Sequence, residues 1–157
     1  VENQHHGNVN KFLGDGFMAL FGIGQTADGS ETAELRNHAH DAVSAGLQMI
    51  EKLAAMNAEL DGTDTPRLGI GIGIHSGTAI VGSMGSEDRL EYTAIGDTVN
   101  LAARVEGLTK VVGEPLLFTK SSRERLSESS PVKTLEPQSV KGQPKPVEIF
   151  TMDNGGV

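Results

Sequence analysis

Two charged residues near the start of the sequence stand where packing alone would not call for them. Lys11 and Asp15 frame a short apolar stretch, and Asp15 stands between two glycines. A carboxylate held between small residues at the tip of a hairpin can reach a metal ion, and carboxylate oxygens are ligands that Mg²⁺ and Mn²⁺ prefer. Aspartate is also a common residue of ordinary turns. The local sequence therefore leaves a metal ligand and a plain turn residue both open.

Further polar residues follow in the second half of the chain. Asn100 and Arg104 are four residues apart, which places them on one face of a helix. Lys141 precedes Gly142 just before the last apolar segment. These residues suit a site that binds a charged ligand, but a solvated helix edge and an ordinary turn would look the same. The sequence has no Walker A motif, no G-x-G-x-x-G, no HExxH and no nucleophile elbow.

The elements that must position these residues follow from periodicity and turn chemistry. Val9–Leu13 and Phe17–Phe21 predict two strands of a hairpin. Helical spacing of apolar residues predicts helices over about Glu31–Glu59 and from Asp97, as the capping residue, to about Leu108. Further strands are expected at Thr78–Met84, Leu90–Ile95, Leu116–Thr119 and Val147–Met152, with a short helix at Ser121–Leu126 and a polar strand or loop at Val132–Val140. This mixture of helices and hairpins predicts an α+β fold.

The segment Leu68–His75 alternates strictly between glycine and isoleucine, which predicts a strand. The isoleucine face is expected to pack on the core. Glycine weakens strands unless another group must approach closely. We therefore expect some part of the protein to lie directly against the glycine face.

Composition limits the possible functions. The chain has 157 residues, which is typical of one domain. Its net charge of -8 argues against binding of nucleic acid, because such proteins need a basic surface. The absence of cysteine excludes disulfides, thiolate zinc sites and a cysteine nucleophile. Without an apolar run long enough for a membrane helix, the composition indicates a cytoplasmic domain, whose parent protein can itself be attached to a membrane.

Three segments together resemble the catalytic domains of class III adenylyl and guanylyl cyclases. They are KFLGDGFMALFG (11–22), GIGIHSGTAIVGSMGSEDRLEYTAIGDTVNLAARVEGLTK (71–110) and VKGQPKPVEIF (140–150). The resemblance covers nearly the whole chain, and the pairing of KFLGDG with GDTVNLAAR is specific. It implies a ferredoxin-like core with additional strands, over residues 1–157, and a homodimer with an active site at each of two positions in the interface.

The resemblance also implies a reaction and residue roles. ATP is converted to 3′,5′-cyclic AMP and pyrophosphate by in-line attack of the ribose 3′-oxygen on the α-phosphorus, with two Mg²⁺ or Mn²⁺ ions per site. Asp15 matches a metal ligand, Asn100 the residue that orients the ribose, and Arg104 the residue that stabilises charge on the α-phosphate. Lys141 matches the lysine on the terminal phosphates. The pair that reads the base matches Lys11 and Thr93.

The base-reading pair has a physical rationale. Adenine N1 accepts a hydrogen bond and its 6-amino group donates one. Lysine can only donate, so Lys11 suits N1, while the hydroxyl of Thr93 can accept from the amine. Guanine reverses both groups, so Lys11 disfavours GTP. Threonine in this position is similar to a bacterial subgroup of the family.

The sequence departs from the family pattern at its start. Relatives begin with a strand of the type F-x-D-I-x-G-F-T, which carries the second metal-binding aspartate, followed by two helices. This chain contains no such segment and starts near the end of the second helix, at residues 1–7. We therefore expect the first strand and first helices to be absent, the 157 residues to be weakly active or inactive, and an upstream regulatory or sensor domain in the parent protein. The alternative is a non-catalytic cyclase homology domain that binds nucleotide as a regulatory module.

Overall fold

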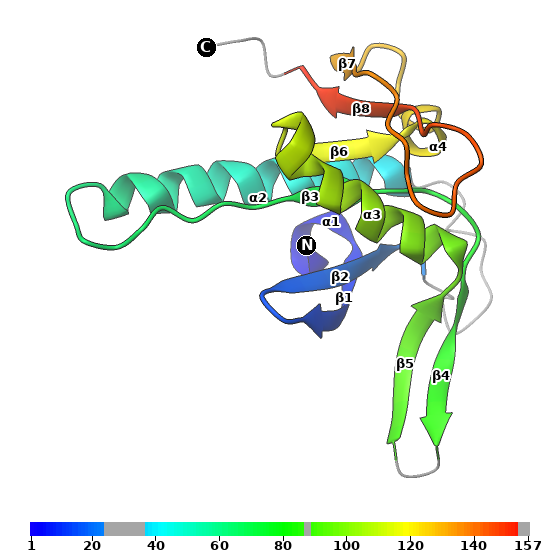
Figure 1. The fold of residues 1–157 in the computed structure, drawn as a ribbon. Helices are drawn as coiled ribbons and strands as arrows, with labels where there is room; N and C mark the ends of the chain where they lie inside the picture. The colour runs from blue at the N-terminus through cyan, green and yellow to red at the C-terminus, as the bar shows by residue number, and fades with distance from the viewer. Residues whose placement is uncertain (24–36, 87–88, 154–157) are drawn as a thin grey trace.

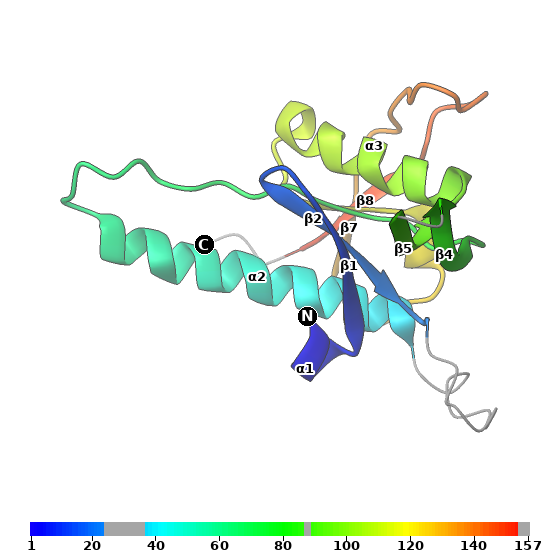
Figure 2. The same ribbon diagram turned by 90° about the horizontal axis from the view of Figure 1, so that it is seen from below.

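The computed structural model describes residues 1–23, 37–86 and 89–153. Their elements form an α+β arrangement, as predicted, with one four-stranded sheet and two separate hairpins (Figure 1). Figure 2 shows the long helix α2 and the helix α3 on opposite sides of the strands. In chain order, the elements are α1 (Glu2–His5), β1 (Gly7–Leu13), β2 (Gly16–Phe21), α2 (His38–Leu60), β3 (Ile72–Ile74), β4 (Ile80–Ser86), β5 (Arg89–Ile95), α3 (Asp97–Val112), β6 (Leu116–Thr119), α4 (Lys120–Arg123), β7 (Val132–Thr134) and β8 (Ile149–Met152).

The four-stranded sheet has the order β3-β6-β8-β7, with β3 parallel to β6 and the other pairs antiparallel. Its central strand β6 is buried along its whole length. Leu116 and Phe118 join the core cluster beneath α2, and Leu117 between them joins the cluster beneath α3. Alternating side chains of one strand thus fill both faces of the sheet, and this sheet holds the two helices in place.

The glycine face predicted in the first strand of this sheet lies directly against α3. A Cβ atom on Gly73 would come within 2.2 Å of the backbone nitrogen of Glu106 and 2.5 Å of the carbonyl oxygen of Ala102. The isoleucines at positions 72 and 74 pack against the core on the α2 side. The close approach is confirmed for Gly71 and Gly73, whereas a Cβ atom at Gly69 would meet no atom within 4 Å. The strand itself is shorter than predicted, since only Ile72–Ile74 pair with β6.

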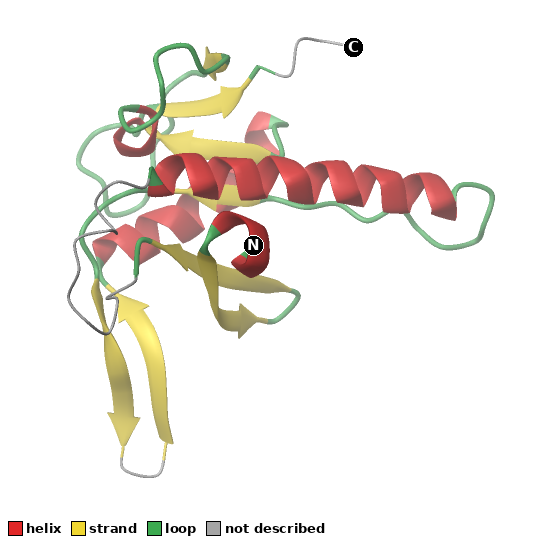
Figure 3. Cartoon of the chain, turned by 180° about the vertical axis from the view of Figure 1, so that it is seen from behind, coloured by secondary structure: helices red, strands yellow, loops and turns green. Residues whose placement is uncertain are grey.

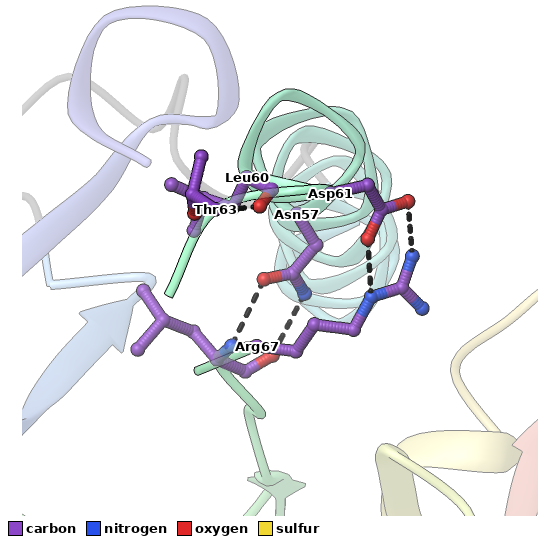
Figure 4. A network of polar contacts seen from close by, with 6 residues as sticks. Asn57, Leu60, Asp61, Thr63 and Arg67 are labelled. Atoms are coloured by element: carbon purple, nitrogen blue, oxygen red, sulfur yellow. Dashed lines mark hydrogen bonds and ion pairs between the residues drawn. The ribbon is translucent and has the colours of Figure 1, made fainter. Parts of the chain in front are cut away.

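The long helix α2 is capped at its N-terminus by Asn37, whose side chain accepts a hydrogen bond from the backbone of His40 at 3.1 Å. The predicted start at 31 lies outside the described residues. At the far end, the Asn57 amide makes two hydrogen bonds with the backbone of Leu68, of 2.8 and 2.9 Å, and Arg67 pairs with Asp61 (Figure 4). These side chains tie the returning chain to the end of the helix. The view from behind shows that the loop after α2 turns back and runs alongside the helix (Figure 3).

One sequence-based expectation is wrong in detail. Asp97 does not cap α3: the capping residue is Gly96, whose carbonyl receives the first helical hydrogen bonds, and Asp97 occupies the first turn. A carboxylate in the first turn is still stabilised by the positive end of the helix dipole.

The described strands form three separate sheets, because neither hairpin shares backbone hydrogen bonds with β3-β6-β8-β7.

Within the described part of the chain, no helix combines the length and the apolar character needed to cross a membrane.

Candidate functional site

The structure brings the strands of Lys11 and Thr93 together through a residue that the sequence analysis did not single out. Asn10, the neighbour of Lys11 in β1, donates from its side-chain nitrogen to the carbonyl oxygen of Tyr92 at 2.9 Å. Its side-chain oxygen accepts from the Thr93 hydroxyl at 3.2 Å. Asn10 is thereby joined to two residues that lie 82 and 83 positions later in the sequence. The signal in the sequence was a polar asparagine within an otherwise strand-like segment, where asparagine is uncommon.

A bulge in the first hairpin accompanies this contact. Val9 pairs with Ala19 and Lys11 with Met18, so Asn10 is an extra residue on β1 without a partner of its own in β2. A bulge of this kind turns a side chain away from its regular direction. In this hairpin, the bulged residue carries the contact to β5.

Asn100 and Arg104 lie on an exposed face of α3, one turn apart, as predicted. The Arg104 guanidinium donates to the backbone carbonyl of Lys141, which brings the helix and the loop after β7 together. Gly142 follows with a φ of +80°, and a Cβ atom there would lie 2.8 Å from Nη1 of Arg104. The turn that carries Lys141 is thus fitted against the guanidinium of Arg104, which lies at the point where the Lys141 side chain begins.

Asp15 is exposed in the turn between β1 and β2, where the preceding Gly14 adopts a φ of +64°. Phe12 and Phe17 of the same hairpin lie with their ring centroids 6.4 Å apart and their planes tilted. The carboxylate is free of side-chain bulk on either side, which suits a metal ligand. Among the described residues, however, no group of three or more histidines and acids is placed to hold a metal ion. Asp15 has the right donor chemistry, but one carboxylate does not make a site for two ions.

A second polar region surrounds His75, to which the sequence analysis gave no catalytic role. Its Nδ1 atom lies 2.7 Å from the Thr119 hydroxyl and 3.1 Å from that of Ser121. Burial, and to a smaller extent the charge of Arg125, lower the pKa of His75. An open hollow of about 440 Å³ adjoins these residues, but none of the six predicted site residues lines it.

Comparison with known proteins places these features in context. Residues 1–154 match the family described as "Adenylate and Guanylate cyclase catalytic domain". An adenylate cyclase from Anabaena cylindrica is 36% identical over 147 residues, which are 92% of this chain and 28% of that protein. This chain thus spans little more than a quarter of the length of that relative.

Solved structures of both kinds of cyclase are similar to the fold. The adenylyl cyclase CyaB from P. aeruginosa superimposes with a TM-score of 0.79 at 26% identity, covering 95% of this chain and 72% of that one. The guanylyl cyclase Cya2 superimposes with a TM-score of 0.71 at 28% identity, over 95% and 71% of the two chains. The overall fold is therefore common to enzymes named for either nucleotide.

Proposed function

The chain belongs to the family of adenylate and guanylate cyclase catalytic domains, and we propose that residues 1–157 are part of an adenylyl cyclase domain that forms 3′,5′-cyclic AMP and pyrophosphate from ATP. One observation carries the choice of nucleotide: Lys11 and Thr93, whose chemistry suits adenine, lie on strands that the Asn10 side chain joins. The similarity to an adenylate cyclase at 36% identity supports the same choice.

The proposed site runs in order from base to phosphates. Thr93 lies near the end of β5, which leads through Gly96 directly into α3. Asn100 and Arg104 follow on that helix, separated by about 6 Å along its axis. The Arg104 guanidinium contacts the backbone of Lys141, and on this basis we assign both cations to the phosphate end of the site. This order matches a nucleotide with its base at β5 and its triphosphate beyond α3.

Each of these side chains has a task in the proposed reaction. Asn100 orients the ribose so that its 3′-oxygen faces the α-phosphorus in line with the departing pyrophosphate. The Arg104 guanidinium stabilises negative charge that grows on the α-phosphate, for which its planar set of donors is better suited than an ammonium group. Lys141 binds the terminal phosphates and favours departure of pyrophosphate. The bond from the 3′-oxygen to phosphorus forms as the bond to the β-phosphate oxygen breaks.

Metal ions belong to the family's chemistry. We propose that Asp15 is one ligand of two Mg²⁺ or Mn²⁺ ions, which would supply charge neutralisation of the triphosphate. The described residues of one chain do not complete that site. The remaining ligands would come from the substrate's phosphates, from a second copy of the chain or from residues beyond those the structure describes.

We further propose that the site is completed between two copies of the chain. Asp15 lies at the tip of the first hairpin, and Phe12 of the same hairpin is 77% exposed. An exposed apolar tip that carries a functional carboxylate suits a surface covered by another subunit. The much greater length of the Anabaena relative is consistent with further regulatory or sensor regions in the whole protein.

The proposal is tested by measuring cyclic AMP and pyrophosphate formed from ATP with Mn²⁺. The assay is run on these 157 residues and, if the gene encodes residues upstream, on the longer protein. Replacing Arg104 by Ala should lower kcat by about 10²–10³-fold, the effect of removing one donor to a developing oxyanion. Lys110→Ala, an exposed change on the same helix, should leave kcat within about twofold, as expected of a surface site.

Two results would replace this proposal. Bound ATP without product in either protein would favour the regulatory nucleotide-binding module. Faster turnover of GTP than of ATP would make the domain a guanylyl cyclase. Product from ATP that Arg104→Ala leaves unchanged would refute the assigned role of Arg104.

A further inference from the structure

The side chain of Asn10 is held between two fixed partners. It is the bulged residue of β1, and both ends of its amide are hydrogen-bonded to consecutive residues of β5. The contact lies next to Lys11 in sequence and on Thr93 itself. It therefore joins one residue proposed to read the base, Thr93, to the chain neighbour of the other, Lys11.

The direction of these hydrogen bonds follows from the chemistry of the groups. The Tyr92 carbonyl oxygen can only accept, so Asn10 has to present its NH₂ group to it. The amide oxygen of Asn10 is then fixed on the side of Thr93. An amide oxygen can also only accept, so the Thr93 hydroxyl has to donate its single proton to Asn10.

The Thr93 hydroxyl can therefore act only as a hydrogen-bond acceptor toward a ligand. A free threonine hydroxyl can turn to donate or to accept, so it can pair with the 6-amino group of adenine or with the 6-oxygen of guanine. With its proton committed to Asn10, Thr93 offers only lone pairs. It can then accept from the adenine amine, while the guanine oxygen would meet another acceptor.

We propose that Asn10 is a positioning residue for nucleotide choice: it holds the Thr93 proton away from the base and so turns an ambivalent hydroxyl into an acceptor. This inference rests on the proposed function, because it assumes that Thr93 faces the base. The same contact sets the spacing between β1 and β5, and hence between Lys11 and Thr93.

The test compares variants at this position by the ratio of kcat/KM for ATP to that for GTP. Asn10→Ala frees the Thr93 hydroxyl, and we expect the ratio to fall by about 5–10-fold, which corresponds to the loss of one oriented hydrogen bond. Asn10→Asp loses the donor to the Tyr92 carbonyl but keeps an acceptor for the Thr93 proton, and should therefore retain most of the ATP preference. Asn8→Ala, an exposed asparagine of the same strand, is the matched control and should leave the ratio unchanged.

A double-mutant cycle separates positioning from general damage. Thr93→Val removes the hydroxyl through which Asn10 is proposed to act. In that background, Asn10→Ala should change the ratio by less than about twofold, because no proton remains to be directed. A fall that is equally large in the Thr93→Val background would overturn the proposal. An unchanged ratio in Asn10→Ala, with a melting temperature like the wild type's, would also overturn it.

Equilibrium binding of non-cleavable ATP and GTP analogues to the same variants keeps the two proposals distinguishable. A wild-type protein that binds the ATP analogue selectively but forms no product would contradict the cyclase function. The Asn10 inference would still be decided by the change in the binding ratio. A wild-type protein that does not discriminate between the two analogues would overturn the inference, whether or not it turns over.

Discussion

The contact between β3 and α3 leads to a sharp prediction for Gly73→Ala. The added methyl would meet the Glu106 nitrogen at 2.2 Å, the Ala102 carbonyl oxygen at 2.5 Å and the Glu106 Cα at 2.7 Å. All three are backbone atoms of one helix, so no side chain can turn aside to make room. Since carbon atoms pack at about 3.5–4.0 Å, α3 would have to move by about 1 Å or more away from the sheet.

Such a displacement would open the core cluster beneath α3. Overpacking of a well-packed core typically costs about 1–3 kcal/mol, and the rigid neighbours at this position favour the upper end. For a domain of this size, 1 kcal/mol changes the melting temperature by about 2–4 °C. We therefore expect Gly73→Ala to lower the free energy of unfolding by about 3 kcal/mol and the melting temperature by about 6–12 °C. Urea unfolding and thermal melting, both followed by circular dichroism, measure the two quantities.

Gly69→Ala provides the matched control, four residues earlier in the same glycine series. A Cβ atom at Gly69 would meet no atom within 4 Å, and its backbone does not need a positive φ. The change should be neutral or stabilise the fold by up to about 1 kcal/mol, since alanine restricts the unfolded chain. The reasoning fails if Gly73→Ala melts within 2 °C of the wild type, or if the two variants are equally destabilised.

Three further predictions concern other parts of the fold. Folding lowers the pKa of His75, so the unfolded chain binds a proton there more readily, and stability present above about pH 6.5 should be lost as the pH falls below it. Between pH 7.5 and 5, the melting temperature should therefore fall less steeply in His75→Gln than in the wild type. Parallel curves for the two proteins would contradict this. Asn57→Ala removes both hydrogen bonds to the Leu68 backbone and should destabilise the fold by about 1–2 kcal/mol, with faster hydrogen exchange of the Leu68 amide; an unchanged exchange rate would count against the contact. Gly142→Ala places a residue with a Cβ atom at a φ of +80° and against Arg104. It should lower kcat for cyclic AMP formation by about tenfold with little change in KM. An effect on KM alone would assign the turn to substrate binding instead.

The sequence predicted local structure well where one element carries its own signal. The hairpin of β1 and β2, the α3 core face and the buried β6 all follow from periodicity or turn residues. The glycine series in β3 even indicated a close approach, although not which element makes it. The lengths of the strands depend on their pairing partners, which the local sequence does not show. Only three residues of the Gly/Ile segment pair with a neighbouring strand, so that strand is short.

The candidate site was predictable by residue type and resemblance, but its contacts were not. Nothing in the local sequence relates Asn10 to Tyr92 and Thr93, because the tertiary fold alone brings these positions together. The hydrogen bond from Arg104 to the Lys141 carbonyl is of the same kind, because its partners lie 37 positions apart in the sequence. The roles of the six predicted site residues remain predictions until variants are assayed.

The separation of the hairpins from the four-stranded sheet has a thermodynamic consequence for ligand recognition. An isolated two-stranded hairpin is only marginally stable in water, whereas α3 packs on the sheet through Leu101 and Val105 and meets the backbone of β3 directly at Gly73. In the proposed site, the phosphate-binding groups lie on this firm support, while the base-reading groups lie on two hairpins that the Asn10 side chain joins to each other. Any ordering of the hairpins on binding costs entropy that offsets part of the affinity for the base, so discrimination between bases should sharpen when a second subunit already holds the hairpins.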